Sequence, residues 1–315
     1  MTSVMAETIA AQPGELRRLL ADEAPIGPSA GRLRGRRILL VGTGTSWHAA
    51  NIGAWFLRAA GAEAWPVQAM DAALGGPRPG PDDGLVLLSH RGTKLYTTDV
   101  VERARAAGAA VVAISGRGSP GADIETVAAE RSSAYTASHL GALMRLAQLA
   151  VALGADLDLA SVPDAVAEVV DGPPVGVEPP ARSLEFIGAG VNQWTAAEGA
   201  LKIRETAYVA ASGLAVEQYL HGPSVAVGPQ DALVALNGGG PGEERLLAVV
   251  RSAESVGVRV RVIEYRAVGE LLSVFPLTAV VQRIALEAAE RLGTNPDSFG
   301  RDVPARAHAL DGIAL

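Results

Sequence analysis

RRILLVGTGTS, residues 36–46, joins an apolar run to a turn made of glycine and hydroxyl residues. Four consecutive aliphatic residues at 38–41 are typical of a strand that is buried on both faces. The segment WHAANIGAWFLRAAG that follows has helical spacing and ends at Gly61. A strand that passes through a glycine turn into a helix is the start of a β-α-β unit, so this stretch predicts a parallel sheet.

The same pattern recurs along the chain. GLVLLSHRGTK (84–94) is a second apolar run with a polar turn, and LEFIGAGVNQ (184–193) repeats the first stretch after a proline-rich segment. We therefore expect an α/β protein with two tandem halves, each a parallel sheet flanked by helices. The expected parts are an N-terminal helical arm over 1–26, a first half over 27–168, and a second half with a C-terminal tail over 169–315. The sequence of the N-terminal arm predicts a short amphipathic helix that is interrupted at Pro13.

The amino-acid composition and net charge exclude several classes of function. Hydrophobic residues make up 49% and charged residues 19% of the 315 residues, which allows sizeable cores. The net charge of −7 argues against a nucleic-acid partner, and the absence of cysteine excludes disulfides and thiolate chemistry. The histidines show no metal-ligand spacing, and we expect no metal and no cofactor. Since the N-terminus does not resemble a signal peptide and no uncharged apolar run approaches about 20 residues, we expect a cytoplasmic protein without a membrane partner.

Two turns are candidates for binding an anion. GTGTS (42–46) and SHRGTK (89–94) each lie where a strand ends and a helix begins, and the positive end of a helix attracts anions. The hydroxyls of Thr45, Ser46 and Ser89 can donate hydrogen bonds, and Arg91 and Lys94 add charge. The alternative is that Ser and Thr simply cap two helices. Neither turn matches the mononucleotide or dinucleotide phosphate motif.

AAEGALKIRETAYV, residues 196–209, holds one of only two lysines in the chain. Glu198, Lys202 and Glu205 follow the spacing i, i+4, i+7 and share one helical stripe. One interpretation is a solvent-facing ladder of ion pairs, each worth about 0.2–0.5 kcal/mol. The other is a catalytic stripe, because lysine, unlike arginine, is a compact cation that can lose its proton. His221, in a Gly-Pro loop after this helix, is a candidate acid or base.

Together these motifs resemble the sugar isomerase (SIS) family, and specifically the isomerase half of glucosamine-6-phosphate synthase. The resemblance covers nearly the whole of the given sequence. It does not extend to the glutaminase domain of that enzyme. It rests on four segments: GTGTSWHAA, SHRGTKLYT, RSSAYTASHLGAL and FIGAGVNQWTAAEGALKIRETAYVAASGLAVEQYLHGP. It implies two SIS subdomains of flavodoxin-like type, a homodimer, and a phosphorylated sugar or amino sugar as ligand.

The resemblance also implies roles for individual residues. Glu205 corresponds to the base that moves a proton between C1 and C2 of the open-chain sugar, and Lys202 corresponds to the lysine beside it. His221 corresponds to the ring-opening histidine, which the partner subunit lends in the family. The loops that would bind the substrate contain Thr45, Ser46, Ser89, His90, Arg91, Lys94 and Ser133.

The sequence departs from the family pattern at three places. Arg91 and Lys94 replace a serine and a threonine of the phosphate loop, and Tyr135 replaces a serine that contacts substrate. The tail NPDSFGRDVPARAHAL lacks the lysine that forms a Schiff base in the synthase. The prediction is therefore an isomerase, deaminase or deglycase that acts on a sugar phosphate through an enediol-type intermediate. The alternative is a non-catalytic SIS protein that binds a sugar phosphate and regulates a partner.

Overall fold

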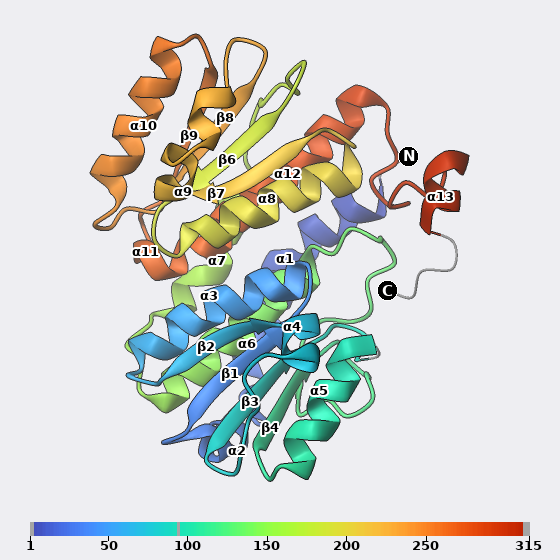
Figure 1. The fold of residues 1–315 in the computed structure, drawn as a ribbon, viewed down its shortest axis with the longest axis vertical. Coiled ribbons are helices and arrows are strands. Elements are labelled where there is room, and N and C mark those ends of the chain that lie inside the picture. The colour runs from blue at the N-terminus through green and yellow to red at the C-terminus, as the bar shows by residue number, and fades with distance from the viewer. Residues whose placement is uncertain (1–2, 93–94, 311–315) are drawn as a thin grey trace. The chain divides into compact units, whose positions relative to one another are not determined.

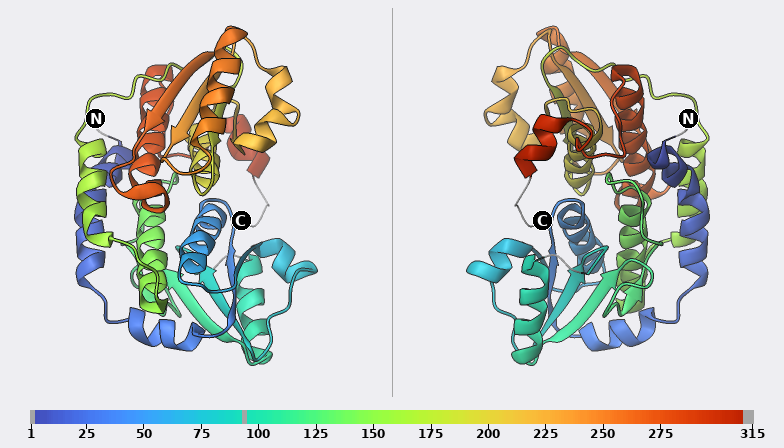
Figure 2. Two further views of the ribbon diagram at one scale, coloured as in Figure 1. Left: turned by 90° about the vertical axis from the view of Figure 1, so that its left-hand side faces the viewer. Right: turned by 90° about the vertical axis from the view of Figure 1, so that its right-hand side faces the viewer.

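The computed structural model describes residues 3–92 and 95–310, which form two compact α/β units (Figures 1 and 2). The first unit comprises residues 12–92, 95–130 and 137–163, and the second comprises residues 3–11, 131–136 and 164–310. Helix α1 (Val4–Ala21) contributes its first residues to the second unit and the rest to the first.

The first unit contains a five-stranded parallel sheet in the order β2-β1-β3-β4-β5. Its strands are β1 (Arg37–Gly42), β2 (Ala64–Gln68), β3 (Asp83–Leu88), β4 (Ala110–Ser115) and β5 (Ile124–Glu125). Its helices, besides α1, are α2 (Ile26–Leu33), α3 (Thr45–Ala59), α4 (Ala69–Leu74), α5 (Leu95–Ala106) and α6 (Ala137–Leu153). The turn η1 (Leu159–Ser161) then leads into α7 (Val162–Val170).

The second unit contains a four-stranded parallel sheet in the order β7-β6-β8-β9. Its strands are β6 (Leu184–Gly188), β7 (Ala211–Ala215), β8 (Ala232–Asn237) and β9 (Arg259–Glu264). Its helices are α8 (Asn192–Thr206), α9 (Val216–Leu220), α10 (Glu243–Ser255), α11 (Gly269–Leu272), α12 (Val274–Leu292) and α13 (Pro304–Leu310), with a turn η2 (Pro223–Ala226). In both sheets the first strand lies between the second and the third, which is the flavodoxin-like order, so the predicted fold class is confirmed.

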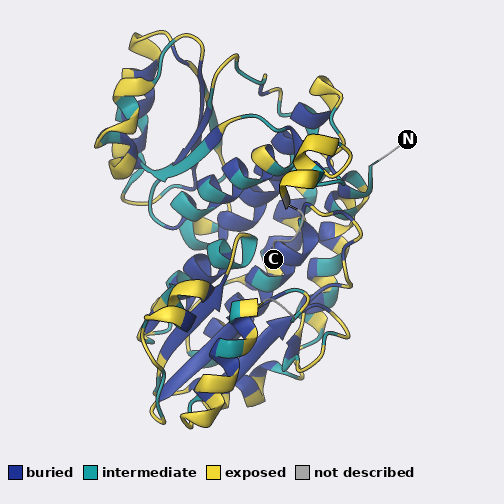
Figure 3. Ribbon diagram, turned by 45° about the vertical axis from the view of Figure 1, so that its right-hand side comes forward, coloured by how far each residue is buried: buried dark blue, intermediate teal, exposed yellow. Residues whose placement is uncertain are grey.

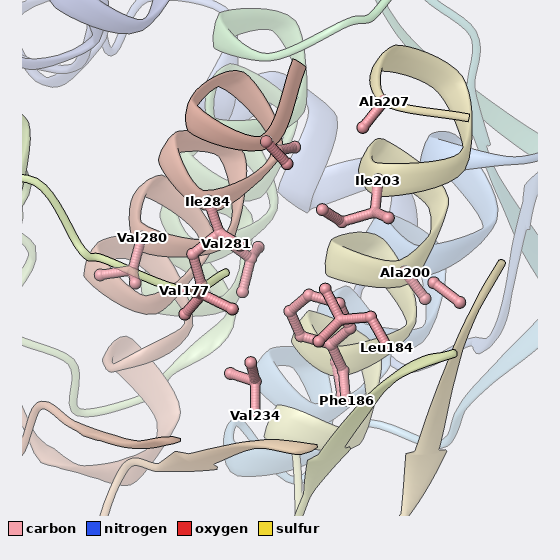
Figure 4. Packing of buried hydrophobic residues seen from close by; sticks show 14 of the residues in the cluster. Val177, Leu184, Phe186, Ala200, Ile203, Ala207, Val234, Val280, Val281 and Ile284 are labelled. Atoms are coloured by element: carbon pink, nitrogen blue, oxygen red, sulfur yellow. The ribbon is translucent and has the colours of Figure 1, made fainter. Parts of the chain in front are cut away.

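Strands β3 and β8, in the interior of the two sheets, are buried along their whole length, as their aliphatic runs predict (Figure 3). Leu39 and Val41 of β1 point to the side covered by α4 and α5, and alternate residues point to the opposite side. In the second unit, Phe186 packs between α8 and α12 in a cluster with Ile203 and Val281 (Figure 4). Residues 269–292 are long and apolar enough to cross a membrane, but 78% of their most apolar window is buried within the structure.

The prediction of a break at Pro13 is wrong, because α1 continues from Val4 to Ala21. Its apolar residues are buried on both sides of the proline, for example Ile9 at 4% and Leu16 at 1% exposure. A proline removes one backbone donor from a helix, and the packing of both halves offsets that loss.

The amino edges of the two sheets are held in the same way. Arg37 donates two hydrogen bonds of 2.9 Å to the carboxylate of Asp83, which joins the starts of β1 and β3. In the second unit, Arg182 donates to both carboxylate oxygens of Asp231 just before β6 and β8. These hydrogen bonds are the main reason that the pKa of each aspartate lies below its usual value.

Candidate functional site

The glycine turns fix how α3 and α8 begin. At Gly42 an added Cβ would lie 2.4 Å from the carbonyl oxygen of Ser46, and at Gly188 it would lie 2.2 Å from that of Asn192. Only glycine fits such close approaches. Gly44 and Gly190 then adopt φ angles of 58° and 54°, a region that glycine enters without strain. The repeated pattern in the sequence therefore has the same structural cause in both units.

The stripe on α8 is buried. Lys202 and Glu198 have side-chain exposures of 1% and 0%, and Glu205 has 13%. The Nζ atom of Lys202 lies 2.6 Å from Oε2 of Glu205 and 3.4 Å from Oε1 of Glu198. The interpretation as a solvent-facing ladder is therefore wrong. A buried ammonium is tolerated because two carboxylates share its charge.

Glu205 lines a cavity of about 620 Å³ in the second unit, whereas Glu198 and Lys202 do not. The cavity lies between the end of α8, the start of β7 and the C-terminal segment. Its lining consists of Leu201, Arg204, Glu205, Tyr208, Val209, Ala210, Phe299, Gly300, Arg306 and Ala309. Of the three charged residues on the stripe, Glu205 alone can therefore meet a ligand in this cavity.

Sequence analysis missed the part that Tyr208 plays in this cavity. Tyr208 follows the C-cap Ala207 of α8 with φ of 57°, at a position where helices usually place glycine. A tyrosine in this conformation costs about 1–2 kcal/mol. Its hydroxyl accepts a hydrogen bond of 2.9 Å from the amide of Gly300, which ties it to the C-terminal segment. No sequence signal marks this contact, since the partners are 92 residues apart.

His221 lies in a different environment. It follows α9, its side chain is 76% exposed, and its Nε2 lies 3.6 Å from Glu217. It is not among the residues that line the cavity of Glu205. The structure of one chain therefore does not bring these two predicted catalytic residues together.

The predicted anion turns follow adjacent strands of the first unit, β1 and β3, at the same edge of the sheet. Thr45 and Ser46 are the first residues of α3, and its N-cap, Gly44, makes no capping hydrogen bond from a side chain. The residue at the N-cap position of α3 is therefore a glycine and not a serine or threonine. Ser89 is buried, and its Oγ accepts a hydrogen bond of 3.1 Å from the amide of Gly92.

The other predicted binding residues are distributed between the units. His90 follows Ser89, and its Nε2 accepts a hydrogen bond of 3.3 Å from the amide of Glu130. Burial is the main cause that lowers the pKa of His90, while Glu130 raises it and Arg91 lowers it. Lys94 lies outside the described residues. Ser133 belongs to the second unit, where its amide donates to the carbonyl of Asp297.

Within residues 3–92 and 95–310, no group of three or more His, Asp or Glu side chains could hold a metal ion. No protein-family model matches the chain.

Among curated proteins, the chain is similar to isomerizing glutamine–fructose-6-phosphate aminotransferases. The protein of Pyrococcus horikoshii is 35% identical over 132 residues, which are 37% of this chain and 22% of that protein. The protein of Gloeobacter violaceus is 24% identical over 346 residues, which cover 93% of this chain and 56% of that protein. The chain thus spans little more than half the length of one relative and matches about a fifth of the other.

Solved structures share the fold over nearly the whole chain. The C-terminal domain of glucosamine-fructose-6-phosphate aminotransferase from Francisella tularensis has a TM-score of 0.79 at 17% identity, covering 94% of this chain and 98% of its own. Tagatose-6-phosphate ketose/aldose isomerase from Escherichia coli has a TM-score of 0.80 at 20% identity, covering 94% and 95%. Glucosamine-6-phosphate deaminase from Thermotoga maritima has a TM-score of 0.75 at 19% identity, covering 94% and 97%. Sequence and fold together confirm the resemblance predicted from the sequence, to the sugar isomerase family and within it to the isomerase half of glucosamine-6-phosphate synthase.

Proposed function

We propose that the chain catalyses proton transfer between C1 and C2 of an open-chain phosphorylated sugar or amino sugar, as an isomerase, deaminase or deglycase. The observation that carries the proposal is the buried charge cluster on α8. Lys202 contacts two carboxylates there, and only Glu205 also lines a cavity. Burying these charges costs free energy, because they lose their hydration. A buried charged cluster with one member facing a cavity is therefore a candidate functional site.

The chemistry assigns a role to each member of the cluster. Glu205 would remove a proton from one carbon and return it to its neighbour. Lys202, whose Nζ lies 2.6 Å from Oε2 of Glu205, would act on the reaction through that carboxylate by stabilising its negative charge. Glu198 would hold Lys202 in place. The resemblance assigns the phosphate of the substrate to the turns that contain Thr45, Ser46 and Ser89.

His221 completes the proposal. Its side chain is 76% exposed in its own chain, as expected of a group that serves the site of a second copy. We assign to it the opening of the sugar ring in a homodimer. This role of His221 stays a prediction from the resemblance. The cytoplasmic location of the protein stays a prediction from the sequence.

Glu205→Gln tests the proposal, because it keeps the shape of the side chain but removes the base. Candidate sugar phosphates are first selected by the thermal stabilisation that they give the parent. NMR in D2O then follows exchange of hydrogen at C1 and C2. The variant should exchange about 10²–10⁴-fold more slowly than the parent. Glu254→Gln, at an exposed glutamate of α10, is the matched control and should leave exchange unchanged.

Exchange at the parental rate in Glu205→Gln would show that the base lies elsewhere. Absence of exchange in the parent, with a ligand that binds, would favour a non-catalytic protein that binds a sugar phosphate.

A further inference from the structure

The cavity that contains Glu205 has a wall formed by the C-terminal segment. Phe299, Gly300, Arg306 and Ala309 line it opposite residues of α8. This segment is held through Tyr208, whose hydroxyl lies 2.9 Å from the amide of Gly300 and 3.2 Å from Oγ of Ser298. Those hydrogen bonds define where the side chains of the segment meet the cavity.

Arg306 is fixed to the same tyrosine. Its guanidinium carbon lies 3.9 Å from the centroid of the Tyr208 ring, within the range of a cation–π contact. Stacking leaves the edge of a guanidinium available for hydrogen bonds, because the N–H donors lie in its plane. Arg306 is therefore held beside the cavity by the Tyr208 ring, and its N–H groups can still donate to a ligand.

Arg204 brings a second positive charge to the cavity. Across the described part of the chain, neither Arg204 nor Arg306 forms an ion pair with a carboxylate. This differs from arginines such as Arg37 and Arg182, whose charges are matched by aspartates. The one carboxylate of the cavity, Glu205, is already bound to Lys202 at 2.6 Å. Two cations thus line the cavity without a carboxylate that neutralises them.

We propose that Arg204 and Arg306 form a subsite for a second anionic group of the substrate, an oxyanion carried at the C1–C2 end of the sugar phosphate. The inference rests on the proposed function, since it is Glu205 that places C1 and C2 in this cavity. Two arginines can bind an oxyanion, whether carboxylate or phosphate, through charge-assisted hydrogen bonds. The subsite therefore selects doubly anionic substrates over simple hexose 6-phosphates.

Two matched pairs of probes test this subsite by isothermal titration calorimetry. Glucitol 6-phosphate and 6-phosphogluconate differ in that the second carries a carboxylate at C1. Fructose 6-phosphate and fructose 1,6-bisphosphate differ by a second phosphate at C1. The parent should bind the doubly anionic member of at least one pair about five- to twentyfold more tightly. The pair that shows the preference identifies the oxyanion as carboxylate or phosphate.

Variants then assign the preference to the two arginines. Arg306→Gln and Arg204→Gln should each remove most of it while leaving the affinity for glucitol 6-phosphate within about twofold. Arg306→Lys keeps the charge and the contact with Tyr208, and should retain much of the preference. Arg251→Gln removes an exposed arginine of α10 outside the cavity, and serves as the control for loss of one positive charge.

Equal binding within both pairs overturns the subsite and leaves the proposed function standing. A preference that persists in Arg204→Gln and Arg306→Gln also overturns it, because another group must then bind the second anion. Failure of all four probes to bind contradicts the proposed function and the subsite with it.

Discussion

Arg145 on α6 is fully buried, and its Nη2 lies 2.5 Å from Oδ2 of Asp22, the residue after α1. The same guanidinium donates to the carbonyl of Leu19 at 3.1 Å and to that of Glu125 at 2.7 Å. It therefore joins three segments of the first unit, and its charge is satisfied by one carboxylate and several carbonyls. Replacing such a group removes partners from oxygens that cannot all reach water.

We expect Arg145→Met to destabilise the protein by about 1–3 kcal/mol for each carbonyl oxygen that is left buried without a donor, whereas Asp22, at 46% side-chain exposure, can be hydrated. Urea denaturation followed by circular dichroism measures the change. Arg131→Met is the matched control, because Arg131 pairs with Glu7 at 76% and 53% side-chain exposure and should cost less than about 1 kcal/mol. Similar midpoints for the two variants would show that the buried guanidinium contributes no more than a surface one.

His90 should make stability depend on pH. Its Nε2 accepts a hydrogen bond, so the folded state holds it neutral, and burial lowers its pKa from the usual 6.5. As the pH falls through about 6.5, the unfolded chain takes up a proton that the folded protein does not. Stability is therefore lost on acidification in this window, and the loss stops below the folded pKa.

His90→Gln removes the titration, and its amide oxygen can still accept from the backbone. The parent should lose more stability than this variant when urea midpoints at pH 7.5 and pH 5.5 are compared. His221→Gln, at an exposed histidine, should behave like the parent. An identical loss in the parent and in His90→Gln would place the titrating group elsewhere.

Arg91 should contribute to binding the phosphate of the substrate. Arg91→Gln is expected to weaken the affinity for glucitol 6-phosphate by about 1 kcal/mol, or roughly fivefold, the upper range for an exposed ion pair. The effect should shrink as the salt concentration rises, because salt screens exposed charges. Arg251→Gln should not change this affinity. An unchanged affinity in Arg91→Gln at low salt would remove Arg91 from the binding turn.

Mixed dimers test whether His221 serves a second copy. Glu205→Gln and His221→Ala subunits should each be inactive alone. After equal mixing and subunit exchange, half of the dimers are mixed and each has one intact site, so about a quarter of the parental activity should return. Two differently tagged Glu205→Gln preparations, mixed in the same way, should recover none. Verified exchange without recovery would show that Glu205 and His221 act from one chain or not together.

The sequence predicted the fold because local and global signals agree in it. Residues 36–46 and 184–193 each combine an aliphatic strand with glycines that the turns require, at Gly42 and Gly188. Pro13 misled the prediction, since a residue-level preference was outweighed by burial on both sides of it.

The candidate site could be predicted only in part. The spacing i, i+4, i+7 is the same for a surface ladder and for a buried stripe, so the burial of Lys202 could not be read from it. The cavity depends on contacts between Tyr208 and the segment around Gly300, which no periodic pattern encodes. Arg204 and Arg306 could not be predicted as cavity residues for the same reason. Whether an arginine pairs with a carboxylate depends on the folded chain and not on a local sequence pattern.

The arginine–aspartate pairs at the amino edges have a consequence for how such a fold diversifies. In the first sheet, Arg37 and Asp83 stand at one end of strands about 20 Å long, and the turns after Gly42 and Leu88 stand at the other. The groups that align the strands are thus separate from those that would select a ligand. Inherited substitutions in the turns can alter which ligand is bound while the alignment of the strands is preserved. The second sheet is aligned by its own pair, Arg182 and Asp231, so its turns can change in sequence independently of those in the first sheet.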